Sequence, residues 1–167
     1  MIITITITKP ANSSKEKIPT IEEIIKNQKE TDQPLFLYLA YNAPHTPIQP
    51  PNDWTQKILQ REPEVSPDRA KYIALVEHMD AGIGRVIKAL KDSNMYSNTL
   101  IFYTSDNGGA LSVGAYNGPL RGGKQDMYEG GIRVPACAVW PKHISSGSET
   151  DQVALLMDLF PTICEVV

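Results

Sequence analysis

The stretch LIFYTSDNGG, residues 100–109, decides the fold class of this chain. Residues 100–105 are mostly apolar, β-branched or aromatic, which is typical of a short strand buried in a sheet. The polar, glycine-rich tetrapeptide that follows is good turn chemistry. The sequence therefore predicts a buried strand with a loop at its carboxyl end.

Two further strands and a long helix are expected around that stretch. Residues 35–40 (LFLYLA) predict a second strand, buried on both faces, and residues 134–139 predict a third strand. Between the strands at 35–40 and 100–105, Ser66 can cap a helix whose first residue is Pro67 and which ends at 92–94. One face of that helix carries apolar residues at steps of four and three: Tyr72, Val76, Met79, Ile83, Val86 and Leu90. This order predicts an α/β fold with a mainly parallel buried sheet and flanking helices.

The ends of the chain carry weaker patterns. Ile and Thr alternate over residues 3–8, which predicts a short strand, and residues 18–29 have the spacing of an amphipathic helix. The proline-rich residues 44–51 predict a stiff loop. Residues 161–167 predict a helix that is too short to be a complete element, so we expect the domain to be cut there.

Composition excludes several classes of protein. The chain has 167 residues, a net charge of -3 and no run of Lys or Arg, so a nucleic-acid-binding surface is not expected. It has no apolar run near the roughly 20 residues that cross a membrane. The first ten residues do not form a signal-peptide pattern. Cys137 and Cys164 could form one bridge or stay as two thiols, and their apolar neighbours favour buried thiols.

Asp106 and Asn107 follow the first strand directly. Ligands of open α/β sheets gather at the carboxyl ends of strands, and carboxylate and amide oxygens suit calcium or magnesium. The same tetrapeptide is also an ordinary turn, and taken alone it favours the turn.

Two other short motifs carry charge that could meet an anion. His45 lies between Pro44 and Pro47 after the second strand, so its imidazole is held in one direction and could bind an anion or transfer a proton. It could equally be a surface histidine. The loop 121–124, Arg-Gly-Gly-Lys, places Lys124 beside glycines that let a backbone approach an anion, although a solvated lysine is the usual explanation.

In combination these motifs are more specific. NAPHTP (42–47), SDNGG (105–109), PLRGGK (119–124) and YEGGIRVP (128–135) occur in this order. The chain therefore resembles the later part of the catalytic domain of the sulfatase family, in the alkaline-phosphatase-like superfamily. The resemblance implies a partial alkaline-phosphatase-like sandwich: residues 1–33 as a segment without a clear match, and residues 34–167 as a catalytic domain truncated at both ends.

The resemblance also implies roles for individual residues. Asp106 and Asn107 would be ligands of a calcium ion. His45 would contact the sulfate and protonate the leaving oxygen, and Lys124 would bind the sulfate beside it. Residues 129–133 look like a structural feature near the site.

The resemblance is incomplete, because sulfatases attack with a formylglycine made from the Cys or Ser of a Cys/Ser-x-Pro/Ala-x-Arg motif. This sequence does not encode that motif: Cys137 is followed by Ala-Val-Trp and Cys164 by Glu-Val-Val. The family's acidic pair of calcium ligands and its Lys-x-His segment are also absent. We therefore expect an incomplete calcium site and no turnover by this chain alone.

Three interpretations follow. The first is a sulfuric ester hydrolase whose remaining half lies upstream and which acts on a sulfate-ester substrate. The second is a non-catalytic remnant that binds an anionic ligand or a partner. The third is a phosphoester hydrolase of the same superfamily. The particular ester, the oligomeric state and the compartment stay open, although the family suggests an exported or lysosomal protein.

Overall fold

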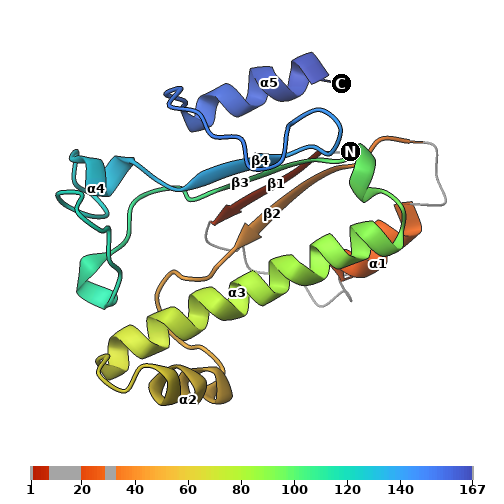
Figure 1. The fold of residues 1–167 in the computed structure, drawn as a ribbon. Helices are drawn as coiled ribbons and strands as arrows, with labels where there is room; N and C mark the ends of the chain where they lie inside the picture. Colours follow the sequence, from red (N-terminus) through yellow and green to blue (C-terminus); the bar gives the residue numbers. More distant parts are fainter. Residues whose placement is uncertain (1, 8–19, 29–32, 167) are drawn as a thin grey trace.

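The structure is a computed structural model that describes residues 2–7, 20–28 and 33–166. It contains a sheet with helices on both sides (Figure 1). The strands are β1 (Ile2–Ile7), β2 (Phe36–Tyr41), β3 (Leu100–Thr104) and β4 (Ala136–Val139). The helices are α1 (Ile21–Gln28), α2 (Asn52–Arg61), α3 (Pro67–Asp92), α4 (Glu129–Ile132) and α5 (Leu159–Val166). Short 3-10 helices lie at Tyr96–Asn98, Leu111–Val113 and Leu156–Asp158.

The four strands pair in the order β2-β1-β3-β4. β1 is parallel to both neighbours, with Ile3 opposite Leu37 of β2 and Ile101 of β3. β3 and β4 pair antiparallel, with Ile101 opposite Val139. β1, β2 and β3 therefore end at the same edge of the sheet, at the left in Figure 1, and the loops that follow β2 and β3 meet there.

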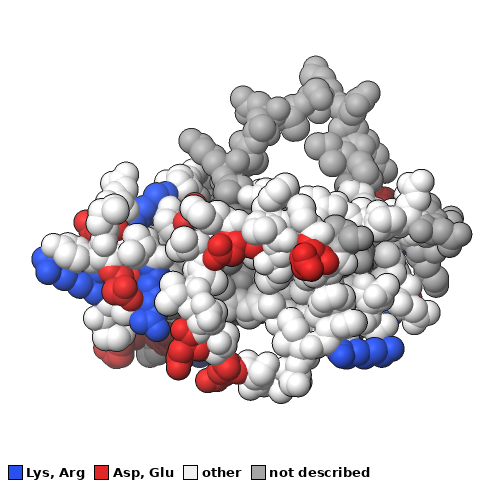
Figure 2. All heavy atoms as spheres, turned by 90° about the horizontal axis from the view of Figure 1, so that it is seen from above, with Lys and Arg blue, Asp and Glu red and all other residues white. Residues whose placement is uncertain are grey.

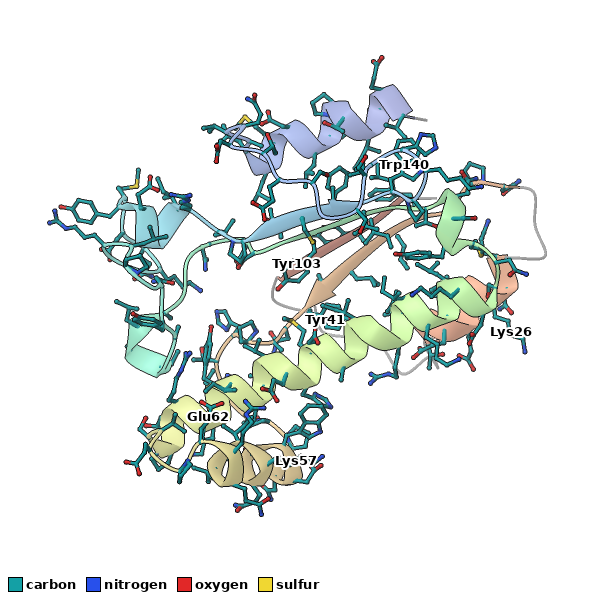
Figure 3. The ribbon with its side chains drawn as sticks, viewed as in Figure 1. Lys26, Tyr41, Lys57, Glu62, Tyr103 and Trp140 are labelled. Carbon is teal, nitrogen blue, oxygen red and sulfur yellow. The ribbon has the colours of Figure 1, made fainter. Side chains whose placement is uncertain are left out.

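Helices α1 and α3 cover one face of the sheet (Figure 1). The core on that face is built from Ile25 of α1, Leu39 of β2, Val86 and Leu90 of α3, and Ile101 of β3. Two tyrosines, Tyr41 and Tyr103, lie between the sheet and α3 (Figure 3) and pack against this core.

The sequence predicted that β2 is buried on both faces, and this prediction is wrong. Phe36 is 59% exposed and Tyr38 is 49% exposed, whereas Leu39 is buried. Side chains alternate between the faces of a strand, so the odd-numbered residues of β2 face α1 and α3 and the even-numbered ones face away. β3, which has a neighbour on each side, is more deeply buried: Leu100 and Thr104 are both at most 5% exposed.

Local chemistry sets the ends of the helices. Ser66 accepts a hydrogen bond from the backbone of Arg69, so α3 begins with Pro67 in its first turn, as predicted, and it ends at Asp92. At α1, Thr20 and Glu23 form reciprocal side-chain-to-backbone hydrogen bonds, which is a capping box. The predicted helix over 18–29 is thus found at Ile21–Gln28; residues 18, 19 and 29 lie outside the described part of the chain.

Helix α2 is an element that the sequence did not predict. Its Ile58 is fully buried against Ala70 and Ala74 of α3, and Trp54 packs around this second core. The ring of His78 on α3 meets Trp54 edge to face, with centroids 5.3 Å apart, so this histidine packs against α2.

The far side of the sheet is less densely covered. Figure 2 looks down on the side where α5 lies and shows a mostly uncharged surface, with Lys and Arg mixed with Asp and Glu at the end where α4 lies. Phe160 of α5 is 75% exposed. Cys137 and Cys164 are both free and exposed, so the expectation of buried thiols is wrong. Among the described residues, no helix is long and apolar enough to cross a membrane.

Candidate active site

A cavity of about 630 Å³ opens at the edge where β2 and β3 end. One wall is the first half of α3, and the other walls are the loops after β2 and β3. His45, Asp106, Asn107 and Lys124 all line this cavity. The structure thus brings the four residues that the sequence singled out into one place, although 79 positions separate the first from the last along the chain.

Asp106 and Asn107 stand where β3 ends. Asp106 is exposed and Asn107 is half-buried. The side-chain amide nitrogen of Asn107 donates to the backbone carbonyl of Gly108 at 3.0 Å. The hydroxyl of Ser105 donates to the backbone carbonyl of Asn107, also at 3.0 Å. These bonds fix the turn and occupy the side-chain nitrogen of Asn107. The side-chain oxygen of Asn107 can therefore act as an acceptor or ligand together with the Asp106 carboxylate.

His45 is held by its own loop, whose two prolines, Pro44 and Pro47, both follow cis peptide bonds. Its Nδ1 lies 2.8 Å from the carbonyl oxygen of Thr46. A carbonyl only accepts hydrogen bonds, so Nδ1 carries the proton in the neutral ring and Nε2 is the nitrogen left for a ligand. This is an arrangement in which an imidazolium could give the proton on Nε2 to a bound oxygen.

Lys124 is held against the Asp106–Asn107 turn by backbone contacts. Its amide donates to the carbonyl of Gly109 at 3.0 Å. Nearby, the amide of Gly108 donates to the carbonyl of Gly131 at 2.9 Å, and the amide of Gly130 donates to the carbonyl of Arg121 at 2.8 Å. The three glycine pairs 108–109, 122–123 and 130–131 thus lie backbone to backbone.

The glycines are needed because the backbones approach so closely. A Cβ added at Gly108 would lie 1.8 Å from the carbonyl oxygen of Gly130, and one at Gly130 would lie 2.1 Å from that of Gly122. No side chain fits in such a space. The segment 129–133, expected to be a structural feature near the site, supplies α4 and is part of this packing.

Asn117 is a residue that the sequence did not single out. Its side-chain oxygen accepts a hydrogen bond from the amide of Gly109 at 2.9 Å, and its side-chain nitrogen donates to the carbonyls of Gly109 and Gly122 at 3.3 and 3.0 Å. It joins the loop 105–109, which contains Asp106 and Asn107, to the loop 121–124, which contains Lys124. In the sequence it belongs to an Asn-Gly-Pro turn between the two motifs, and such a turn has an ordinary explanation by itself.

The α3 wall carries aromatic and charged side chains. Tyr72, Arg69 and Glu77 of α3 line the cavity, and Arg69 donates to the carbonyl of Gly114 at 2.6 Å, which ties the loop after β3 to the start of α3. Burial raises the pKa of Tyr72 and of Tyr103, so both stay neutral phenols that can donate hydrogen bonds. Arg121, whose role the sequence left open, is not among the lining residues; its guanidinium lies 3.7 Å from the ring centre of Tyr128.

The donor set fits a hard cation only in part. Asp106 and Asn107 offer two oxygen ligands of the type that calcium prefers, where six to eight are typical. Within residues 2–7, 20–28 and 33–166, no group of three or more His, Cys, Asp or Glu side chains could hold a metal ion. Within the described residues, the oxygens of Asp106 and Asn107 do not make up a metal site by themselves.

Comparison with known proteins identifies the class to which this fold and site belong. The sulfatase family model matches residues 8–167, so its match starts upstream of the motifs quoted above. The chain belongs to the sulfatase family.

Individual relatives agree with that assignment. The chain is 38% identical to N-acetylgalactosamine-6-sulfatase of Sus scrofa over 144 residues, which are 84% of this chain and 26% of that protein. It is 34% identical to arylsulfatase J of Mus musculus over 143 residues, which are 86% of this chain and 23% of that protein. The chain thus spans about a quarter of the length of these curated relatives.

Solved structures give the same fold. The crystal structure of Ps i-CgsB in complex with k-i-k-neocarrahexaose matches with a TM-score of 0.83 and 40% identity, over 87% of this chain and 32% of that chain. The putative sulfatase yidJ from Bacteroides fragilis matches with a TM-score of 0.70 and 27% identity, over 87% of this chain and 34% of that chain. The fold is therefore that of sulfatases, with α and β elements mixed.

Proposed function

We propose that this chain supplies the sulfate-binding and proton-donating side of a sulfatase active site, in an enzyme that hydrolyses sulfate esters. The observation that carries the proposal is the convergence of His45, Lys124 and the Asp106–Asn107 pair on one cavity at the strand ends. Family membership supports the reaction class. The division of roles rests on the chemistry of the side chains.

Cleavage of a sulfate ester breaks the S–O bond and leaves negative charge on the alcohol oxygen. A proton from the imidazolium Nε2 of His45 neutralises that oxygen as it leaves. The hydrogen bond from Nδ1 to the Thr46 carbonyl keeps the ring oriented for this transfer. Lys124 places a compact positive charge beside the sulfonyl oxygens, which carry charge throughout the reaction.

Asp106 and Asn107 would hold a calcium ion together with ligands from outside this chain. When bound, such an ion supplies positive charge to the sulfate oxygens. The attacking nucleophile is not encoded here, since the formylglycine motif is absent from the sequence. We therefore propose that this chain alone binds sulfate without turning over an ester.

A carbohydrate sulfate is the substrate class that we propose. Two observations support it: relatives include N-acetylgalactosamine-6-sulfatases, and a structural neighbour at 40% identity was solved with k-i-k-neocarrahexaose. The cavity of about 630 Å³, with the neutral phenols of Tyr72 and Tyr103 in its wall, has room and hydrogen-bond donors for a sugar.

The test uses a protein in which this chain is joined to the segment that carries the formylglycine motif. It should release sulfate from a sulfated sugar and from 4-nitrophenyl sulfate, and faster than phosphate from 4-nitrophenyl phosphate. Lys124→Ala and Asp106→Ala should each lower kcat/KM by at least about a hundredfold, whereas the matched surface variants Lys57→Ala and Asp151→Ala should not. Faster release of phosphate than of sulfate would favour a phosphoester hydrolase. Binding of the sulfated sugar without release of sulfate would favour a non-catalytic protein.

A further inference from the structure

We infer that Asn117 is a positioning residue that fixes the distance between the Asp106–Asn107 pair and Lys124. The Asp106–Asn107 pair, proposed to bind a cation, lies on the loop 105–109. Lys124, proposed to bind the sulfate, lies on a separate loop, 121–124. Within the described residues, the chain between these loops contains no α-helix or strand and one short 3-10 helix, Leu111–Val113. Their relative position must therefore come from side-chain and backbone contacts between them.

Asn117 makes three of those contacts with a single side chain. Its oxygen faces the amide of Gly109, and its nitrogen faces the carbonyls of Gly109 and Gly122. The opposite orientation of the amide would place oxygen against two carbonyls and nitrogen against an N–H group. The surroundings thus accept Asn in one orientation, and an isosteric Asp would lose both donated bonds.

The two glycines beside this side chain have little room for a side chain of their own. A Cβ at Gly109 would lie 2.9 Å from the Asn117 oxygen, and a Cβ at Gly123 would lie 3.3 Å from its nitrogen. The side chain is half-buried between the two glycine backbones. It therefore works as a spacer as well as a hydrogen-bonding group, and a smaller residue would let the two loops separate or collapse.

One further bond spans the same two loops and shares the Gly109 carbonyl with the Asn117 side chain. The Lys124 amide donates to the Gly109 carbonyl at 3.0 Å, directly across the gap between the loops. A second bond, from the Asp126 amide to the Gly123 carbonyl at 2.9 Å, joins two residues on the Lys124 side and does not reach the loop 105–109. If Asn117 sets the spacing, its loss should weaken the first bond and leave the second intact.

The experiment is amide hydrogen exchange by NMR on this chain and on Asn117→Ala, with Asn52→Ala, an exposed position, as the matched control. We expect the protection of the Lys124 amide to fall by about tenfold or more in Asn117→Ala, while that of the Asp126 amide changes by less than about threefold. Unchanged protection at Lys124 would overturn the inference. Equal losses at both amides would also overturn it, since they would indicate general loosening.

A second readout tests the functional consequence, which rests on the proposed role of Lys124 in binding sulfate. Sodium sulfate is titrated at constant ionic strength. Asn117→Ala should weaken sulfate binding by about tenfold, and should have no further effect in a Lys124→Ala background, because Asn117 acts through Lys124. Additive losses would overturn that coupling. If the unsubstituted chain binds no sulfate, the proposed function fails, and amide exchange alone decides the role of Asn117.

Discussion

Substitution of Gly130 tests the close packing on which the candidate site depends. A Cβ at this position would lie 2.1 Å from the Gly122 carbonyl oxygen and 2.6 Å from that of Arg121, where ordinary contact begins at 3.4 Å. Both neighbours are backbone atoms, so a whole loop must move. The hydrogen bond from the Gly130 amide to the Arg121 carbonyl would be lost with that movement.

The magnitude follows from these two effects. Overpacking costs about 1–3 kcal/mol and the lost hydrogen bond about 1 kcal/mol, so Gly130→Ala should lower the free energy of unfolding by about 2–4 kcal/mol. Gly84→Ala is the matched control, because Gly84 lies on the exposed side of α3 with nothing within 4 Å of an added Cβ. It should raise stability by about 0.5–1 kcal/mol.

Urea unfolding, followed by circular dichroism, measures both variants. With a slope of about 1–3 kcal/mol per molar urea, the Gly130→Ala midpoint should fall by about 0.7 M or more, and the Gly84→Ala midpoint should rise slightly. A Gly130→Ala midpoint equal to that of the unsubstituted chain would refute the backbone-to-backbone packing of the three glycine pairs.

Three further predictions address the helix cap, the proposed acid and the cysteines. Ser66→Ala removes the bond from the Arg69 amide and should lower the free energy of unfolding by about 1 kcal/mol in the same urea assay; no change would mean that this cap does not stabilise α3. In the protein with the formylglycine motif, His45→Ala should lower kcat more for a sugar sulfate than for 4-nitrophenyl sulfate, because the poorer leaving group needs the proton; equal losses would contradict its role. Cys137 and Cys164 are exposed, so both should react with a thiol reagent without denaturant, and one or no reactive thiol would contradict that exposure.

Elements with strong local signals could be predicted from the sequence. The cap at Ser66, the proline at 67 and the apolar stripe of α3 agree with the helix at Pro67–Asp92. β3 and the turn after it lie where the pattern placed them. Local signals were sufficient here because capping, turn chemistry and helical periodicity act within a few residues of the chain.

Other features depend on contacts that are distant in sequence. α2 has no side-chain cap at Pro51 and follows a proline-rich loop, so only its packing of Ile58 against α3 reveals why it forms. The continuous apolar run of β2 suggested burial on both faces, but β2 is an edge strand and Phe36 lies on the face away from α1 and α3. Strand order and edge position are not encoded in a single short run.

The candidate site shows the same division. Each of His45, Asp106, Asn107 and Lys124 could be selected from its motif, and the resemblance implied that they act together. Asn117 could not be selected in this way, because its role depends on two loops meeting, and an Asn-Gly-Pro turn has an ordinary explanation by itself. Residues that hold loops together carry less sequence signal than residues that carry charge.

We propose that His45, Lys124 and the Asp106–Asn107 turn form one sulfate-binding site. The most direct measurement is an NMR titration of this chain with sodium sulfate at constant ionic strength. We expect saturable shifts concentrated at the His45 ring and at the amides of Lys124 and Gly109, and their loss in Lys124→Ala. Absence of saturable shifts, or shifts spread over surfaces away from the cavity, would contradict it.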